Sequence, residues 1–164
     1  MALPTKILPG FSATLYAQPG ASPTALTTAA LSTYATVSAL AVIGNLVPVE
    51  AIPAFGQDDA VASFGVAGSR QSDKIPVQSA PTSMSITAAW NPSDAVLLLL
   101  RDDAYNGTID RTFVISATDG TGIVIYAFNG RVSQWTIDSA PGAEAKVNFT
   151  IHPRGNKYGW SASA

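Results

Sequence analysis

The stretch from Thr82 to His152 constrains the fold of this chain more than any other, because apolar and polar residues alternate through most of it. In residues 83–90 the alternation is clean, and it places four apolar side chains on one face: Met84, Ile86, Ala88 and Trp90. A period of two residues is typical of a strand with one face buried and the other exposed. The pattern therefore predicts a β-rich domain whose strands pack one face on a common core.

One segment inside this stretch departs from the alternation and predicts a helix over residues 92–104. Asn91 suits the N-cap, Pro92 suits the first helical position, and Asp94 favours the positive end of the helix dipole. Asn106–Gly107 suits a left-handed exit from the helix.

Two properties of this helix point beyond it. Residues 96–100 are apolar on every side of the helix. We therefore expect this helix to be buried on more than one side, either by the sheet plus a loop or by a neighbouring subunit. Asp102 and Asp103 stand at the end of the helix where negative charge is unfavourable. Either both carboxylates are solvated, or one of them is paired with Arg101, Arg111 or an arginine of a neighbouring subunit.

Four strands are expected after the helix, and they are residues 109–118, 123–128, 131–138 and 145–152. Turn signals separate them at Asp119–Gly122, at Asn129–Gly130 and at Ala140–Gly142. In the first strand Phe113, Ile115 and Ala117 are expected to point inward. In the last strand the inward residues are Ala145, Val147, Phe149 and Ile151. These strands form an antiparallel meander.

The first half of the chain is less regular. Residues 11–18 alternate and predict a strand, after which Pro19–Gly20 turns the chain. Ser22 and Pro23 suit the start of a short helix. Residues 37–49 are predicted to form a second strand. Residues 50–81 are predicted to be a long loop, with a candidate short strand over 60–66.

Together these elements predict a single domain over residues 1–164. Its fold class is all-β-rich: a two-sheet antiparallel β-sandwich or rolled barrel, with one flanking α-helix at 92–104 and the long loop at 50–81. A chain of 164 residues is long enough to bury a core without disulfides or a metal.

Charge is scarce, and this bears on the partners of the chain. Only 12% of the residues are charged, against roughly 25% in an average globular domain. Surfaces poor in charge are typical of subunit contacts, so we expect a homo-oligomer. The net charge of −2 argues against tight binding to a phosphate backbone but suits a wall that DNA slides past. The absence of cysteine from the sequence excludes disulfides and thiolate metal sites.

The beginning of the sequence lacks the layout of a signal peptide. Residues 24–44 are uncharged and long enough to be considered as a membrane span, but they contain seven Ser or Thr residues and have no flanking Lys or Arg anchors. We therefore expect no membrane partner.

Residues for catalysis are few. His152 is the only histidine of the sequence and is expected to be an ordinary residue on the polar face of a strand. No sequence motif of a phosphate-binding loop, a dinucleotide site, a zinc protease or a serine hydrolase is present. The sequence predicts no enzyme, no catalytic, cofactor-binding or metal residue, and no cofactor.

The three tryptophans are expected to play two roles. Trp90 and Trp135 lie on strand faces, where core packing is favoured over a sugar-binding platform. Trp160 lies in a tail after the last predicted strand, where it either docks on an adjacent subunit or belongs to a loosely packed end.

Several segments resemble the tail tube proteins of long-tailed bacteriophages. The matching segments are Ser69–Pro76 with its Lys-Ile-Pro core, Ser83–Asp94 with its Trp-Asn-Pro helix start, Phe128–Trp135, and Ala145–Ile151. The resemblance covers about residues 69–152. Val77 and Ala80 stand where the family usually has glycines, which puts the turn there in doubt.

The resemblance implies a structural virion protein located in the phage tail and made in the cytoplasm of a bacterial host. Six copies would form a ring, and stacked rings would form the hollow tube through which double-stranded DNA passes. The implied partners are the tape-measure, tail-terminator and tail-tip proteins. We expect residues 50–81 to make the ring-to-ring contact, and strands 109–137 to contribute to subunit contacts or to the lumen.

Two alternatives remain open from the sequence. The first is another phage particle protein, such as a decoration or tail-terminator subunit, which forms a discrete ring or trimer and no filament. The second is a carbohydrate-binding β-sandwich, which would be monomeric and bind glycans through exposed aromatic residues.

Overall fold

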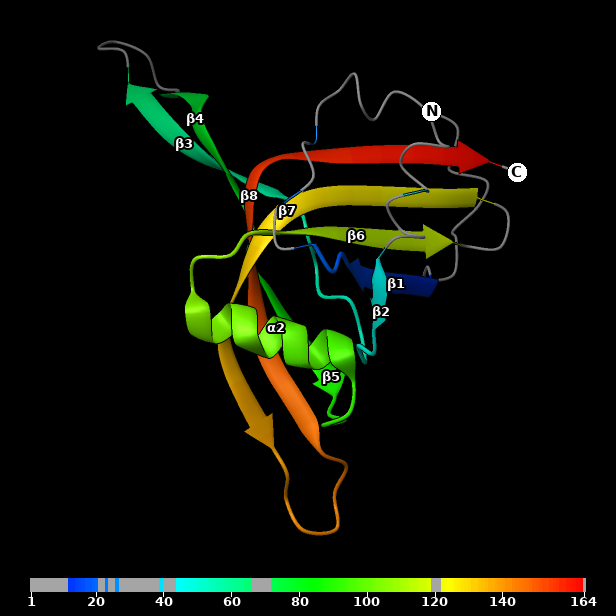
Figure 1. Cartoon of the computed structure of the whole chain (residues 1–164). Coiled ribbons are helices and arrows are strands. Elements are labelled where there is room, and N and C mark those ends of the chain that lie inside the picture. The colour runs from blue at the N-terminus through cyan, green and yellow to red at the C-terminus, as the bar shows by residue number, and fades with distance from the viewer. Residues whose placement is uncertain are drawn as a thin grey trace.

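The computed structural model describes residues 12–20, 23, 26, 39, 44–65, 72–118 and 122–163. Its elements, in chain order, are β1 (Ser12–Ala17), β2 (Asn45–Val47), β3 (Gln57–Gly65), β4 (Ser72–Pro81), β5 (Met84–Ala89), α2 (Ala95–Asn106), β6 (Arg111–Thr118), β7 (Gly122–Asp138) and β8 (Lys146–Ser163). The predicted all-β-rich class with a flanking helix is confirmed. Figure 1 shows that α2 lies against the concave side of the curled sheet.

Six strands form one antiparallel sheet in the order β2-β1-β6-β7-β8-β5, and β3 pairs with β4 in a separate two-stranded sheet. Strands β7 and β8 are long and bend together, so they belong to both halves of the sheet (Figure 1). In one half they continue the β1–β6 side, and in the other half β5 pairs with the first residues of β8. The architecture is therefore the rolled form of the prediction, in which two halves of one sheet face a common core.

The predicted hairpin turn at Asn129–Gly130 is wrong, because β7 runs through both residues without interruption. Gly130 pairs with Arg111 on one side and with Pro153 on the other. A Cβ atom at Gly130 would lie 3.0 Å from Ile151 Cγ2 and 3.2 Å from the carbonyl oxygen of His152. This glycine thus permits the close approach of two strands at the bend, and the pairing on both sides overrides the local turn preference.

The predicted end of the last strand at residue 152 is also wrong. β8 continues to Ser163, and Tyr126 pairs with Gly159 across β7 and β8. A register shift occurs opposite Phe128, where Gly155 adopts a φ of 70°. A bulge with a glycine in this conformation bends a strand without ending it. Trp160 therefore belongs to β8 and not to a tail beyond the sheet.

The helix begins later than predicted. Asp94 is its N-cap, and its carboxylate accepts a hydrogen bond of 2.9 Å from the backbone N–H of Val96. The side chain of Asn91 instead accepts from the backbone N–H of Ser93, one turn earlier. Both side chains thus accept from the backbone two residues on, but only Asp94 stands directly before the helix. The left-handed exit is confirmed at Gly107, whose φ is 61°.

In the first half of the chain, the predicted strand over 11–18 is confirmed as β1. Of the strand predicted over 37–49, the described residues show β2 and an isolated antiparallel bridge between Val49 and Ala88 of β5, whereas Ala39 is helical. The long loop predicted over 50–81 is largely the β3–β4 hairpin, which contains the candidate strand 60–66 up to residue 65. Most of the short helix predicted from Ser22 lies outside the described residues.

The main core lies between α2 and the two halves of the sheet. Val96, Leu97 and Leu100 of the helix are at most 3% exposed, which places the sheet side of the apolar segment in the core. The other buried members include the predicted inward residues: Met84, Ile86, Ala88, Phe113, Ile115, Val147, Phe149 and Ile151. A second cluster of Val114, Ile125 and Ala127 is buried on the opposite face of the sheet, where Leu26 packs against it.

Candidate assembly surfaces

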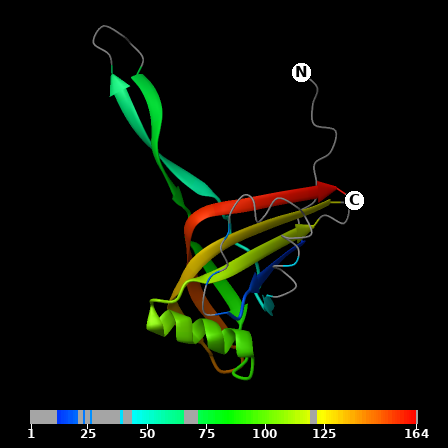
Figure 2. The same cartoon turned by 45° about the horizontal axis from the view of Figure 1, so that its top comes forward.

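The β3–β4 hairpin projects from the body of the molecule, as Figures 1 and 2 both show. Its strands pair from Gln57–Pro81 at the root to Gly65–Ser72, with an irregularity between Ala60 and Val61. Within the described residues, no third strand pairs with either outer edge of this hairpin. A two-stranded ribbon is marginal in water by itself, so this element is built to be covered by something else.

The root of the hairpin is fixed to the sheet. The ring of Phe55 packs edge-on against Tyr126 of β7, with ring centroids 5.0 Å apart. Beside this pair lies an apolar cleft of about 340 Å³, lined by Ala13, Ile52, Phe55, Ala117, Val124 and Tyr126. The backbone N–H of Thr82 donates to the carbonyl of Gly56 and closes the base of the hairpin. The direction in which the hairpin leaves the body is therefore defined by packing.

The curled sheet leaves backbone edges open. β5 pairs with β8 only from Lys146 to Ile151, so within the described chain the rest of β8 has a neighbour on one side alone. Proline in a strand is confined to such positions, which explains why Pro153 is tolerated there. The other edge of the sheet is β2, a strand of three residues in which Leu46 is 55% exposed. Directly after β2 the chain hydrogen-bonds to β5, from Glu50 N–H to the Thr87 carbonyl and from Ala89 N–H to the Pro48 carbonyl, so within the described chain this edge is open only along β2 itself. Open edges of this kind accept a strand from another chain.

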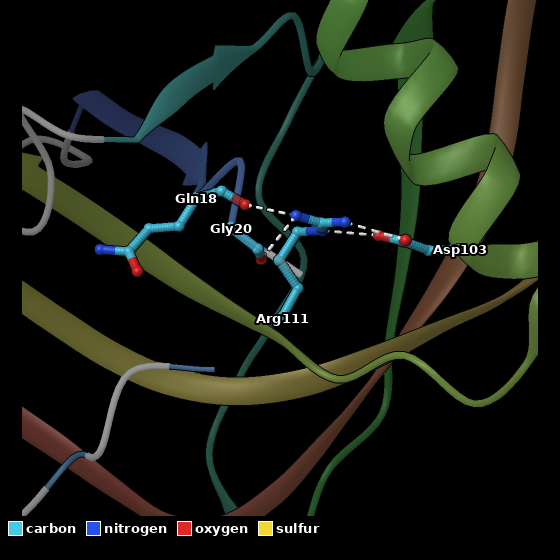
Figure 3. Close-up of polar contacts among 4 residues, drawn as sticks. All are labelled: Gln18, Gly20, Asp103 and Arg111. Carbon is cyan, nitrogen blue, oxygen red and sulfur yellow. Dashed lines mark hydrogen bonds and ion pairs between the residues drawn. The ribbon is translucent and has the colours of Figure 1, made fainter. Parts of the chain in front are cut away.

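The end of α2 is held by a buried ion pair, drawn in Figure 3. Asp103 and Arg111 are each 2% exposed, and the guanidinium donates through Nε and Nη2 to the two carboxylate oxygens at 2.5 and 2.9 Å. Its Nη1 donates to the carbonyl oxygens of Gln18 and Gly20 at 2.8 and 2.9 Å. The arginine thus ties the end of the helix, the start of β6 and the chain leaving β1 into one unit.

This arrangement decides between the two interpretations of the aspartates at the end of the helix. Asp103 has a buried partner, Arg111, which was one of the candidates from the sequence. Asp102 is paired with Arg101 at the surface, at 2.9 Å, with more than half of its side chain exposed. A surface pair of this kind contributes about 0–1 kcal/mol, so the buried pair is the structurally important one.

His152 has two partners that the sequence pattern did not indicate. Its Nδ1 lies 2.8 Å from Ser83 Oγ, and its Nε2 lies 2.7 Å from Ser133 Oγ. Ser83 directly precedes β5, whereas Ser133 lies in β7 and His152 in β8. Among the described contacts no carboxylate reaches the ring, and a serine nucleophile needs an oriented base and an oxyanion site. The geometry fits a polar cross-link between three strands.

A second polar link lies at the bend of the sheet. Asp110 accepts from Arg131 Nε at 2.9 Å and from Arg154 Nη1 at 2.8 Å. Arg131 also donates to the carbonyl of Thr108. These contacts hold the loop after α2 against β7 and β8. In the part of the chain that the structure describes, no group of three or more His, Asp or Glu side chains is arranged to hold a metal ion.

β7 carries a bulge near its C-terminal end, a few residues before the turn into β8. The register with β8 shifts between Ser133 and Thr136, and Gln134 adopts a φ of 56°, which is unfavourable for a residue with a Cβ. Trp135 packs against the core as predicted: it stacks on Phe149 with centroids 5.4 Å apart and meets Trp90 edge-on at 5.9 Å. Its indole Nε1 is buried and has no hydrogen-bond partner among the described residues.

Beyond the bulge, the β7–β8 tip (residues 136–145) extends past the core. Residues 136–144 are all exposed, and Ile137 is 47% exposed. The predicted turn at Ala140–Gly142 is confirmed, with Ala143 donating to the carbonyl of Ala140. At its base Lys146 is paired with Glu50. The hydrogen bond to Glu50 and then the charge of that carboxylate raise the pKa of Lys146 above its ordinary value of 10.5.

No helix among the described residues is long and apolar enough to cross a membrane. The stretch 24–44 that was considered as a span lies largely outside the described residues.

Three solved structures have a similar fold. A chain of the anti-feeding prophage baseplate, determined by cryo-EM with six-fold symmetry, aligns with a TM-score of 0.62 at 9% identity over 98% of this chain and 97% of that one. A chain of the sheath–tube complex of an extracellular contractile injection system, PVC, in the extended state gives 0.63 at 11% identity over 98% and 94%. The SPP1 tail tube gives 0.54 at 12% identity over 93% and 77%.

No family model and no curated protein matches the sequence. At 9–12% identity the likeness to the three structures concerns the fold. The likeness to tail tube proteins that the sequence motifs predicted is confirmed at that level. This chain therefore shares its fold with the SPP1 tail tube protein and with chains of a baseplate and of a contractile sheath–tube complex.

Proposed function

We propose that this chain, which has the fold of tail tube proteins, is a non-enzymatic structural subunit that assembles with copies of itself into six-membered rings, and that the rings stack into a hollow tail tube. The observation that carries the proposal is the combination, on the same body, of a protruding hairpin and sheet edges that no other described strand covers. Each feature is unfavourable in a monomer, and self-assembly covers both.

Ring formation uses the edges of the curled sheet. Among the described residues, the second half of β8 has no strand on one of its sides, and β2 with its exposed Leu46 lies at the other edge of the sheet. Pairing of one edge with the other edge of the next copy is a heterologous contact, and such contacts close into a ring when the rotation between copies allows it. In this arrangement strands β6 and β7 (residues 111–138) contribute to the ring wall and the lumen.

Stacking uses the segment 50–81. Its hairpin leaves the body in a defined direction because Phe55 and Tyr126 fix its root. A ribbon that already has ordered strands loses less conformational entropy on binding than a disordered loop of the same length. The hairpin is therefore suited to reach from one ring to the next.

The low charge suits this role. Only 12% of residues are charged, and the net charge is −2. Uncharged faces lose little hydration when they are buried between subunits, and a weakly acidic chain does not retain the phosphate backbone of DNA. In this proposal the tube belongs to a virion, double-stranded DNA passes through it, and tape-measure, tail-terminator and tail-tip proteins bind its ends.

The proposal is tested by negative-stain electron microscopy of the purified protein at increasing concentration, with light scattering in parallel. We expect six-membered rings and hollow tubes. A matched variant replaces Ala60–Gln78, the outer part of the hairpin, with a short Gly-Ser turn and keeps the root at Phe55. This variant is expected to form rings without tubes. A wild-type protein that stays monomeric at every concentration, including in the presence of preformed tail tips, contradicts the proposal.

A second candidate is a subunit that forms one ring at an end of a tube, as a tail terminator or a baseplate ring does. The fold likeness to a chain of a six-fold symmetrised baseplate favours this alternative. It predicts discrete rings of one size at all concentrations, whereas the tube subunit predicts filaments whose length grows with concentration.

A further inference from the structure

The β7–β8 tip and the β3–β4 hairpin leave the body at opposite ends. Figure 1 shows this: β3 and β4 project from one end, and the turn between β7 and β8 projects from the other. If copies stack along one direction, the hairpin of one copy approaches the tip of the next. From this arrangement we expect the tip to be the surface that faces the hairpin of the neighbouring copy.

The tip has an apolar face that its own subunit does not cover. Ile137 lies opposite Val147 in the register, so both side chains are on the core face of the sheet. Val147 is fully buried, whereas Ile137 is 47% exposed. Half-buried Trp90 and Trp135 continue the same face towards the core. The apolar face of the core thus extends onto the tip as far as Ile137. No side chain of the described chain covers Ile137 there.

Two energetically unfavourable features lie at the root of the tip. Gln134 has a left-handed backbone, and the indole N–H of Trp135 is buried without a hydrogen-bond partner. Strain and unsatisfied polar groups persist where a surrounding function requires them. Here both lie in one bulge, which aims the tip away from the axis of β7. Neither feature improves the core, so the direction of the tip is the property that they maintain.

We propose that the β7–β8 tip, centred on Ile137, is the docking surface for the β3–β4 hairpin of a second copy of this chain in the adjoining ring. This inference rests on the tube proposed above and adds the surface that receives the hairpin. Contact between two different surfaces of identical subunits is heterologous, and it propagates as an open filament. Each ring therefore presents hairpins at one end and tips at the other, which gives the tube a polarity.

Ile137→Lys tests the apolar part of the contact. The side chain is half exposed, so the subunit is expected to fold and to form rings, while the concentration at which tubes appear rises about tenfold or more, as expected for loss of a buried aliphatic contact. Tyr105→Lys is the matched control, since Tyr105 is 73% exposed on α2, and it is expected to leave tube formation unchanged.

Cross-linking tests proximity without relying on loss of assembly. The sequence contains no cysteine, so Ala62→Cys in β3 and Ile137→Cys introduce the only two thiols. Ala62 is exposed. A bis-maleimide is expected to join copies of this double variant into a ladder in tubes, but not at concentrations below those at which tubes form. The pair Ala62→Cys with Tyr105→Cys is expected to give no ladder.

The outcomes separate the two proposals. Tubes that form from Ile137→Lys at the wild-type concentration, together with no ladder from the Ala62 and Ile137 pair, overturn the docking surface and leave the tube intact. Absence of wild-type rings and tubes overturns both proposals. A ladder confined to tubes, with tube loss in Ile137→Lys, supports the docking surface.

Discussion

The buried ion pair at the end of α2 and the bulge at the root of the β7–β8 tip differ in how their buried polar groups are satisfied: those of the ion pair have hydrogen-bond partners, and one in the bulge has none among the described residues. Arg111 and Asp103 are removed from water, but the guanidinium makes four hydrogen bonds, two to the carboxylate and two to backbone carbonyls. At the bulge, Trp135 Nε1 is buried without a partner, and Gln134 carries an unfavourable backbone conformation.

This difference indicates which part of the molecule stabilises the fold and which part is suited to contact another subunit. Satisfied buried networks define one arrangement of the elements that they join. The bulge contributes the ring of Trp135 to the core, but its left-handed residue and unsatisfied indole N–H do not, and residues 136–144 beyond it are all exposed. It is retained at an element whose direction matters. We expect substitutions to be costly at the first region and mild at the second, and the following measurements test this order.

The largest effect is expected for Arg111→Met. The change leaves the carboxylate of Asp103 buried without its partner and two backbone carbonyls without a donor, which costs about 3–5 kcal/mol of unfolding free energy. Urea unfolding below the assembly concentration measures this. Arg101→Met is the control, because the Arg101–Asp102 pair is exposed and is worth about 0–1 kcal/mol. Equal effects of the two substitutions would remove the distinction between the regions.

A smaller effect is expected for Gly130→Ala at the bend that connects the two halves of the sheet. The new methyl group meets Ile151 Cγ2 at 3.0 Å and the His152 carbonyl oxygen at 3.2 Å, and such overpacking costs about 1–3 kcal/mol. Gly56→Ala is the control, because nothing lies within 4 Å of a Cβ there. If Gly130→Ala is as stable as the wild type in the same urea titration, β7 is not constrained at the bend as the structure indicates.

Gln134→Gly is expected to stabilise the isolated subunit slightly. Glycine adopts a φ of 56° without the steric cost of a Cβ, and relief of that cost is worth about 1 kcal/mol, partly offset by greater freedom of the unfolded chain. The same variant is expected to form tubes less readily, since the tip loses its defined direction. Thermal unfolding and sedimentation of tubes check the two parts, and destabilisation of the subunit would refute the assigned strain.

The smallest effect is expected for Glu50→Gln at the base of the tip. The pKa of Lys146 is raised by Glu50, so the pair contributes stability that is fully present below the ordinary pKa of lysine and is lost as pH rises through the raised value. In the variant the pKa of Lys146 falls towards 10.5, as measured by NMR titration of its Cε protons, while stability at neutral pH changes little. An unchanged pKa would show that the contact does not persist in solution.

Much of the fold was predictable because its signals are local. The alternation of Met84, Ile86 and Ala88 gave a strand that the structure confirms, and its inward residues are the buried ones. The inward set of β6 was also predicted, as was the glycine that ends the helix. An unfavourable pair of aspartates at the end of the helix was enough to suggest a partner such as Arg111. These patterns depend on residues within one element or close to it.

The errors share a different origin. Asn129–Gly130 has the strongest local preference for a hairpin turn, yet Gly130 lies in the middle of β7 because strands on both sides pair with it. Residues 153–156 contain proline and glycine, yet β8 continues through them at a bulge on an open edge. Neither His152 contact was foreseen, because Ser83 and Ser133 are 69 and 19 residues away along the chain.

The sequence by itself determined the β-rich class, the position of the helix, the faces of most strands and the scarcity of charge that points to assembly. These follow from side-chain periodicity and composition, which act over a few residues. Only the tertiary structure decided that β7 and β8 run on as bent strands, that Asp103 and not Asp102 is buried with an arginine, and that two hairpins project from opposite ends. Those outcomes depend on which distant strands pair, and pairing with neighbours on both sides outweighs the preference of any single turn.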